Sequence, residues 1–155
     1  MKKSGFTLIE LLVVIVIIGI LAALISTNLY GGRQRATDSQ KKSNLNQLKI
    51  ALHSYYANYH KYPADRNGRY LDGCGATGDT ACTTGSSFTA GGVEYLSWVP
   101  SGDFTYKQCD GGDSFRIKAT MSNVSDPDIA ESQLKCPVGS CGVNYSTSEY
   151  VLCGE

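Results

Sequence analysis

Apolar and polar residues follow different spacings in successive parts of the chain. Residues 6–25 are apolar except for Thr7, Glu10 and Gly19. A helix of this length rises about 30 Å, at about 1.5 Å per residue, which matches the hydrocarbon core of a bilayer. The apolar region of a cleaved secretory signal is shorter and ends at a small-residue cleavage site. The first pattern therefore predicts a transmembrane helix.

Farther along, apolar residues recur every three or four positions, as they do on one face of an amphipathic helix. The stripe consists of Leu45, Leu48, Leu52, Tyr55 and Tyr59. We expect the helix to continue to about Tyr59 and this face to cover a small sheet. The tyrosines at its end, Tyr55, Tyr56, Tyr59 and Tyr62, are assigned to packing, because aromatic stripes at helical spacing usually belong to a core. The adjacent Gly31 and Gly32 mark the expected kink.

The C-terminal part alternates with a period of two. Residues 103–108 and 114–121 alternate on either side of a glycine-containing turn, which predicts an antiparallel hairpin. Residues 143–145 and 150–153 predict a further strand or strand pair, whereas the Gly-, Thr- and Ser-rich residues 68–92 predict a loop. The fold class expected is α+β, with one long N-terminal helix on an antiparallel sheet of three to four strands.

The six cysteines all lie in this C-terminal part, at Cys74, Cys82, Cys109, Cys136, Cys141 and Cys153. Their even number predicts three disulfides, since the spacings lack the short knuckles of structural zinc sites. Many pairings are possible. We favour Cys74 with Cys82 and Cys136 with Cys141 as local loops, which leaves Cys109 to pair with Cys153.

Charge is unevenly distributed although the 14 basic and 14 acidic residues sum to zero. Residues 28–69 carry a net charge of +6 and residues 70–155 carry −7. A negative head repels polyanions, so nucleic acid is not an expected partner. The sequence contains no nucleophile with its base, no metal cluster and no phosphate-binding loop, so we expect neither an enzyme nor a cofactor.

Four carboxylates in the head are weak candidates for calcium: Asp110, Asp113, Asp126 and Asp128. Calcium sites in loops use alternating oxygen ligands and end in a bidentate glutamate, and that spacing is missing here. Turn and helix-cap roles are favoured for these residues instead.

The opening residues, Met-Lys-Lys-Ser-Gly-Phe-Thr-Leu-Ile-Glu, followed by the apolar run, resemble the class III signal of type IV prepilins and type II secretion pseudopilins. The resemblance covers about the first 30 residues. It implies that a prepilin peptidase cuts between Gly5 and Phe6 and methylates the new N-terminus at Phe6. It also implies that Glu10 pairs with the α-amine of Phe6, usually that of a neighbouring subunit.

The resemblance further implies the organisation of the whole chain: a cleaved leader (1–5), a transmembrane and assembly helix (6–27), an amphipathic stalk helix (28–62) and a disulfide-bonded head (63–155). The expected function is a structural subunit of a type IV pilus or similar filament. A major pseudopilin of a type II secretion system and a DNA-binding minor pilin of the competence type are the alternatives.

Partners and location follow from the same resemblance. The expected partners are identical or homologous subunits, the prepilin peptidase, an inner-membrane assembly platform, and lipid before assembly. The subunit would cross the inner membrane once, with its head on the exported side, and then join an extracellular pilus or a periplasmic pseudopilus. The sequence alone does not choose between these two filaments.

Overall fold

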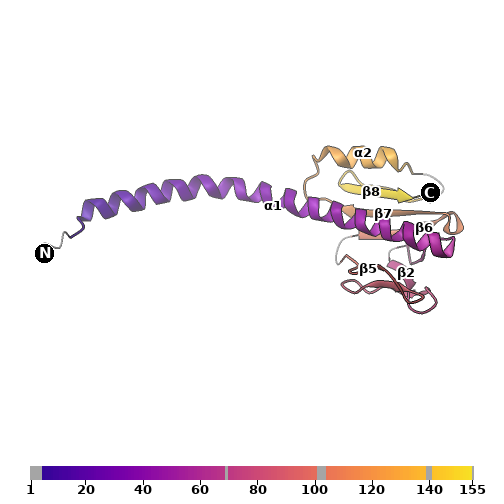
Figure 1. Ribbon diagram of the computed structural model, residues 1–155. Coiled ribbons are helices and arrows are strands. Elements are labelled where there is room, and N and C mark those ends of the chain that lie inside the picture. The colour runs from indigo at the N-terminus through magenta and orange to yellow at the C-terminus, as the bar shows by residue number, and fades with distance from the viewer. Residues whose placement is uncertain (1–4, 69, 101–103, 139–140, 155) are drawn as a thin grey trace. The chain divides into compact units, whose positions relative to one another are not determined.

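The computed structural model describes residues 5–68, 70–100, 104–138 and 141–154, and gives the backbone alone for residues 24–30. The chain divides into two units, residues 1–36 and 37–155, each described by itself. Helix α1 (Leu8–Tyr59) begins in the first unit and ends in the second (Figure 1). Its last residue confirms the predicted end of the helix. Gly31 and Gly32 are both helical, and a kink there stays a prediction.

The main sheet of the second unit is antiparallel and has three strands in the order β6-β7-β8, namely β6 (Phe104–Cys109), β7 (Ser114–Thr120) and β8 (Glu149–Gly154). Strands β6 and β7 form the predicted hairpin, with Tyr106 opposite Ile117. Its turn is a 3-10 turn, Asp110–Gly112, in which Gly111 has a φ of 71°. Glycine adopts this left-handed conformation without a steric penalty. The predicted α+β fold class is confirmed.

The loop predicted over residues 68–92 is wrong in part, because the segment contains short strands. One antiparallel sheet consists of β1 (Ala64–Arg66), β2 (Tyr70–Cys74) and β3 (Thr80–Ala81), and a separate hairpin consists of β4 (Phe88–Ala90) and β5 (Val93–Leu96). Leu71 and Phe88 are almost completely buried, so the segment contributes to the core. Strands this short do not show a clear alternation in the sequence.

Residues 37–59 of α1 supply one wall of that core. Leu48, Leu52 and Tyr55 are at most 2% exposed and pack in one cluster with Phe115 and Ile117 of β7. Burial raises the pKa of the Tyr55 hydroxyl to about 12. The hydroxyl therefore stays protonated and donates a hydrogen bond of 3.1 Å to the carbonyl of Gly78.

The other predicted tyrosines also pack. Tyr62 is buried, and Tyr56 and Tyr59 lie half-buried against the same cluster. The Tyr55 and Tyr59 rings stack with their centroids 4.3 Å apart. The packing role assigned to the tyrosine stripe is confirmed.

A second helix, α2 (Pro127–Lys135), packs on β8 and was not predicted as a helix. Its residue Ser132 accepts a hydrogen bond of 3.1 Å from the backbone N–H of Val151, on the edge of β8 that faces away from β7. That edge is therefore occupied by a helix rather than by a fourth strand. Residues 143–145, which were predicted as a strand, accordingly have irregular backbone.

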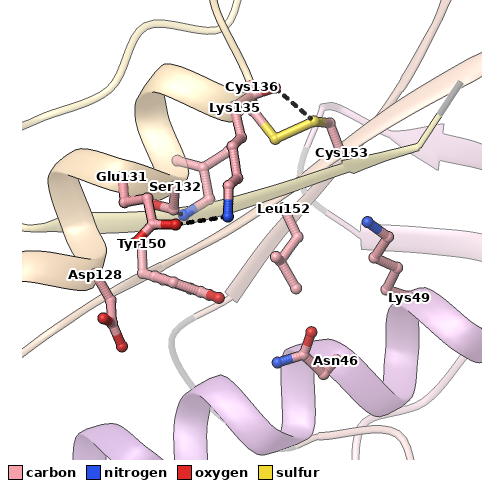
Figure 2. A pocket seen from close by; sticks show the side chains of 11 residues that line it. Asn46, Lys49, Asp128, Glu131, Ser132, Lys135, Cys136, Tyr150, Leu152 and Cys153 are labelled. Atoms are coloured by element: carbon pink, nitrogen blue, oxygen red, sulfur yellow. Dashed lines mark hydrogen bonds and ion pairs between the residues drawn. A yellow bond between two sulfur atoms is a disulfide. The ribbon is translucent and has the colours of Figure 1, made fainter.

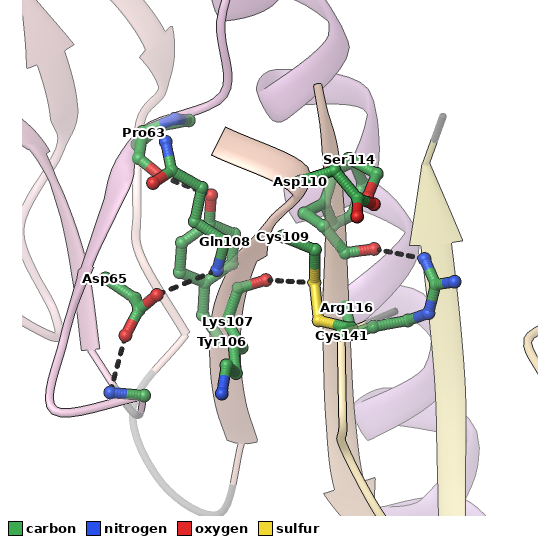
Figure 3. The surroundings of a disulfide bond; sticks show 12 residues. Pro63, Asp65, Tyr106, Lys107, Gln108, Cys109, Asp110, Ser114, Arg116 and Cys141 are labelled. Atoms are coloured by element: carbon green, nitrogen blue, oxygen red, sulfur yellow. Dashed lines mark hydrogen bonds between the residues drawn. A yellow bond between two sulfur atoms is a disulfide. The ribbon is translucent and has the colours of Figure 1, made fainter. Parts of the chain in front are cut away.

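The three disulfides join Cys74 to Cys82, Cys109 to Cys141 and Cys136 to Cys153. The first is the predicted pair, and the predicted pairs Cys136–Cys141 and Cys109–Cys153 are wrong. Cys136 directly follows α2, and the packing of α2 on β8 brings it to Cys153. Cys141 then lies against the end of β6 at Cys109, as Figure 3 shows. Nearness in sequence misled the prediction because the packing of α2 on β8, and not the distance along the chain, decides which cysteine lies beside Cys136.

Candidate assembly site

The N-terminal part of α1 and the residues just before it expose nearly all of their apolar side chains. Phe6 is 84% exposed and Leu8 is 82% exposed. The residues that follow are about half exposed or more: Ile9, Leu11, Leu12, Val13, Val14, Ile15, Val16, Ile17, Ile18, Ile20 and Leu21. Because this run is continuous, it covers every side of the helix. A helix that is apolar all round requires lipid or other protein around it.

Within the part of the chain that the structure describes, no helix is both long and apolar enough to cross a membrane.

Glu10 closes the first turn of α1 through a capping box with Thr7. Its Oε2 accepts a hydrogen bond of 2.8 Å from the Thr7 backbone N–H and one of 2.7 Å from the Thr7 hydroxyl. The Thr7 hydroxyl in turn accepts from the Glu10 N–H at 3.3 Å. This reciprocal arrangement satisfies amide groups that the start of a helix leaves free. The sequence signal was the Thr-x-x-Glu spacing before an apolar run, and the sequence reasoning overlooked it.

Gly5 has no packing neighbour that would require a glycine. A Cβ built at this position meets no other heavy atom within 4 Å. The fold of the described residues therefore does not explain the absence of a side chain at Gly5.

Two of the four calcium candidates bind a lysine. The ammonium of Lys42 lies 2.6 Å from a carboxylate oxygen of Asp126 and 2.7 Å from one of Asp128. Burial lowers the pKa of Lys42, but the hydrogen bonds to both carboxylates outweigh it and the pKa is raised. The hydrogen bond from Lys42 lowers the pKa of Asp126. Asp126 also caps α2 by accepting from the Asp128 N–H at 3.0 Å, which is the cap role favoured from the sequence.

The other two candidates flank the β6–β7 turn. Asp110 begins the turn and accepts a hydrogen bond from the Ser114 hydroxyl, and Asp113 follows the turn. In the described parts of the chain, no group of three or more His, Cys, Asp or Glu side chains is placed to hold a metal ion. The carboxylates thus occupy turn and cap positions.

The sequence reasoning also missed Asp38, a buried carboxylate near the start of the second unit. Asp38 is 1% exposed, and its two oxygens accept hydrogen bonds of 2.8 Å and 2.7 Å from the backbone N–H groups of Ser122 and Asn123. A charged acceptor of this kind forms stronger hydrogen bonds than a neutral one. Asp38 therefore fastens the segment after β7 to the helix.

A groove of about 510 Å³ lies between α1 and α2 over β8 (Figure 2). Asn46 and Lys49 line it from α1, while Glu131 and Lys135 line it from α2, where they form an ion pair of 2.6 Å. Figure 2 also shows the Cys136–Cys153 disulfide at its end. Its charges are mixed and one pair is already neutralised, so the groove has no clear preference for a charged ligand.

A comparison with protein families identifies the start of the chain. A family described as the prokaryotic N-terminal methylation motif matches residues 1–26. No solved structure matches the chain.

Curated relatives extend the match beyond the first helix. A type II secretion system core protein G of Aeromonas hydrophila is 37% identical over 140 residues, covering 86% of this chain and 95% of the relative. The protein of the same name from Escherichia coli is 43% identical over 67 residues, which is 43% of this chain and 46% of that protein. A type IV major pilin protein PilA of Myxococcus xanthus is 41% identical over 61 residues, or 39% of this chain and 28% of the relative. With several relatives, therefore, the chain aligns over only about half of their length.

Proposed function

We propose that this chain, which belongs to the family of type IV pilins and type II secretion pseudopilins, is the major pseudopilin of a type II secretion system. Members of this family are filament subunits and not enzymes, which confirms the non-enzyme prediction. The observation that carries the secretion role is the alignment with the Aeromonas core protein G, which covers 95% of that relative and therefore includes its head. The alignment with the Myxococcus pilin covers 28% of that protein.

This comparison reverses the order of the two functions expected from the sequence. The type IV pilus was placed first, although the sequence alone does not choose between the two filaments because they share the N-terminal signal and the α+β plan. The relative that aligns through the head favours the secretion pseudopilus instead. The DNA-binding alternative receives no support, since the head is acidic and no relative described above is named for nucleic-acid binding.

Processing and assembly complete the proposal. The prepilin peptidase removes residues 1–5 and methylates Phe6, and the inner membrane holds residues 6–27 until the assembly platform extracts the subunit. The head (63–155) then lies on the exported side, joined by the stalk helix (28–62). The exposed apolar run at the start of α1 supports this sequence of events.

Glu10 is proposed to pair with the α-amine of Phe6 on the neighbouring subunit. In the described chain its carboxylate is bound only by uncharged groups of Thr7. A carboxylate moved into an apolar surrounding is costly unless an opposite charge compensates it. The new amine supplies that charge after cleavage.

The test separates charge from capping. Glu10→Gln retains an oxygen that can accept from Thr7 but removes the negative charge, so we expect membrane-bound protein and at least about a tenfold loss of filaments and of secretion. Glu94→Gln, which removes an exposed carboxylate from the head, is the matched control and should assemble normally. Normal filaments from Glu10→Gln would refute the ion pair.

Mass spectrometry of the purified subunit tests processing. The proposal predicts a mature chain that begins at methylated Phe6, and Gly5→Ala should retain the leader. Deletion of the gene should abolish export of the secreted enzymes of the host. Unchanged export in the deletion strain, together with filaments of this subunit on the surface of the wild type, would contradict the secretion role and favour a surface pilus.

A further inference from the structure

The turn between β1 and β2 begins with an asparagine that is followed by a glycine, Asn67 and Gly68. Both residues have left-handed backbone, with φ values of 58° and 65°. Asparagine and glycine adopt this conformation more readily than other residues, so the turn accounts for the pair. Asn67 is exposed to solvent. An exposed Asn-Gly pair is also the dipeptide in which an asparagine side chain reacts most readily with its own backbone.

That reaction starts at the backbone nitrogen of Gly68. Once this nitrogen has lost its proton to the solvent, it attacks Cγ of the Asn67 side chain, and glycine has no Cβ to obstruct the approach. A bond forms between the nitrogen and Cγ. The bond from Cγ to the side-chain nitrogen breaks, and that nitrogen takes up a proton and leaves as ammonia. Water then opens the succinimide ring and produces aspartate or isoaspartate at position 67.

Isoaspartate would damage the hairpin, because its main chain runs through the former side chain and is longer by a carbon atom. The register of β1 and β2 pairs Arg66 with Tyr70 and Asp65 with Leu71. Leu71 is 2% exposed and belongs to the core. A longer turn displaces the strand that carries this side chain. Deamidation would therefore affect the packing of the head as well as its charge.

The structure places a carboxylate on the proton that the reaction must remove. Oδ2 of Asp65 accepts a hydrogen bond of 2.5 Å from the Gly68 backbone N–H. Its Oδ1 accepts one of 3.0 Å from the Gln108 backbone N–H in β6, and this second bond holds the carboxylate in position (Figure 3). A deprotonated Gly68 nitrogen would lose a charge-assisted hydrogen bond and would face a negative charge instead. Both effects oppose the first step of the reaction.

We infer that Asp65 protects the turn against deamidation, and that Asn67 is the residue modified when this protection is lost. The inference uses only contacts within the second unit, so it does not depend on the proposed secretion role. Asp65 thereby has a chemical role in addition to its structural one. It determines how long the head keeps its original covalent structure.

Incubation of the purified full chain in detergent at neutral pH tests the inference. Mass spectrometry of chymotryptic peptides measures the conversion of Asn67, and an isoaspartate assay confirms the succinimide route. Asp65→Ala should convert Asn67 at least about tenfold faster than the wild type. Arg66→Ala is the matched control, because it removes an ion pair of 3.1 Å with Asp72 from the same hairpin and leaves the Gly68 hydrogen bond in place. Its rate should equal that of the wild type.

Two further measurements separate protection of the proton from loosening of the fold. Asp65→Asn keeps an acceptor oxygen but removes the charge, so its rate should lie between those of the wild type and Asp65→Ala. Hydrogen exchange at the Gly68 amide removes the same proton and should accelerate in the same order. Wild type unfolded in urea should deamidate at least as fast as folded Asp65→Ala.

Three results would overturn the inference. The first is a wild-type rate that is the same in the folded chain and in urea. The second is an Asp65→Asn rate no higher than that of the wild type. The third is an Arg66→Ala rate as high as that of Asp65→Ala, since a looser hairpin would then explain the acceleration without any action of the carboxylate.

Discussion

Residues 5–23 and residues 37–59 contribute to the same helix, yet their apolar side chains have opposite surroundings. Leu12 is 50% exposed, whereas Leu48 is completely buried against the sheet. An exposed leucine contributes little to the stability of the isolated subunit, and a buried one contributes through its packing. The difference assigns folding to the second unit and leaves the apolar surface of the first unit available for assembly.

The largest expected effect is on the free energy of unfolding, and it separates substitutions at these two leucines. Leu48→Ala leaves a cavity in the core and should lower the free energy of unfolding by about 2–5 kcal/mol. Leu12→Ala should change it by less than about 0.5 kcal/mol. Urea unfolding of the full chain in detergent, followed by near-ultraviolet circular dichroism, measures both. Equal losses would contradict the division of roles between the two units.

The disulfides sharpen the comparison, because they occur only in the second unit. Replacing Cys109 and Cys141 together by alanine opens a connection between residues 32 positions apart. We expect a loss of about 2–4 kcal/mol in the free energy of unfolding. Peptide mapping of the wild type under non-reducing conditions checks the pairing, and a Cys136–Cys141 peptide would contradict it.

Asp38 tests the junction between the helix and the head. Asp38→Ala leaves the backbone N–H groups of Ser122 and Asn123 without their acceptor. The expected loss is about 1–3 kcal/mol in the free energy of unfolding. The adjacent exposed Ser39→Ala is the control and should have almost no effect. Hydrogen exchange should show faster exchange at the two amides in Asp38→Ala alone.

The smallest effect concerns the pH dependence of the Lys42 cluster. The hydrogen bond from Lys42 lowers the pKa of Asp126 in the folded state. The Asp126 carboxylate therefore takes up a proton more readily in the unfolded state than in the folded state. This stabilisation is present above the ordinary pKa of 3.8 and is lost as the pH falls through the lower folded value. Its size should be about 1 kcal/mol or less, since the cluster is partly exposed. As the pH is lowered into the acid range, the free energy of unfolding of Lys42→Met should fall less steeply than that of the wild type.

Much of the fold was predictable from the sequence because long elements repeat their pattern many times. The helical stripe that ends at Tyr59 and the hairpin around Gly111 are of this kind. Strands β2 to β4 escaped prediction, since two to five residues give no periodicity. The same holds for α2, whose nine residues carry only two buried side chains.

The candidate site was predictable only as far as its residue types allowed. Glu10 stands out because it is a carboxylate in an apolar run. Its spacing from Thr7 is typical of a capping box, but that signal was overlooked. Lys42 and Asp38 look like ordinary surface charges in the sequence. Their partners lie more than 80 residues away and are brought close only by the packing of the head on the helix.

The two C-terminal disulfides interleave, because Cys136 lies between Cys109 and Cys141, and Cys141 lies between Cys136 and Cys153. A single proteolytic cut anywhere between Cys109 and Cys153 therefore leaves the two fragments covalently joined. After such a cut, strand β8 stays covalently attached to the rest of the subunit unless at least one of these bonds is reduced. A subunit nicked in this region would thus keep its place in a polymer.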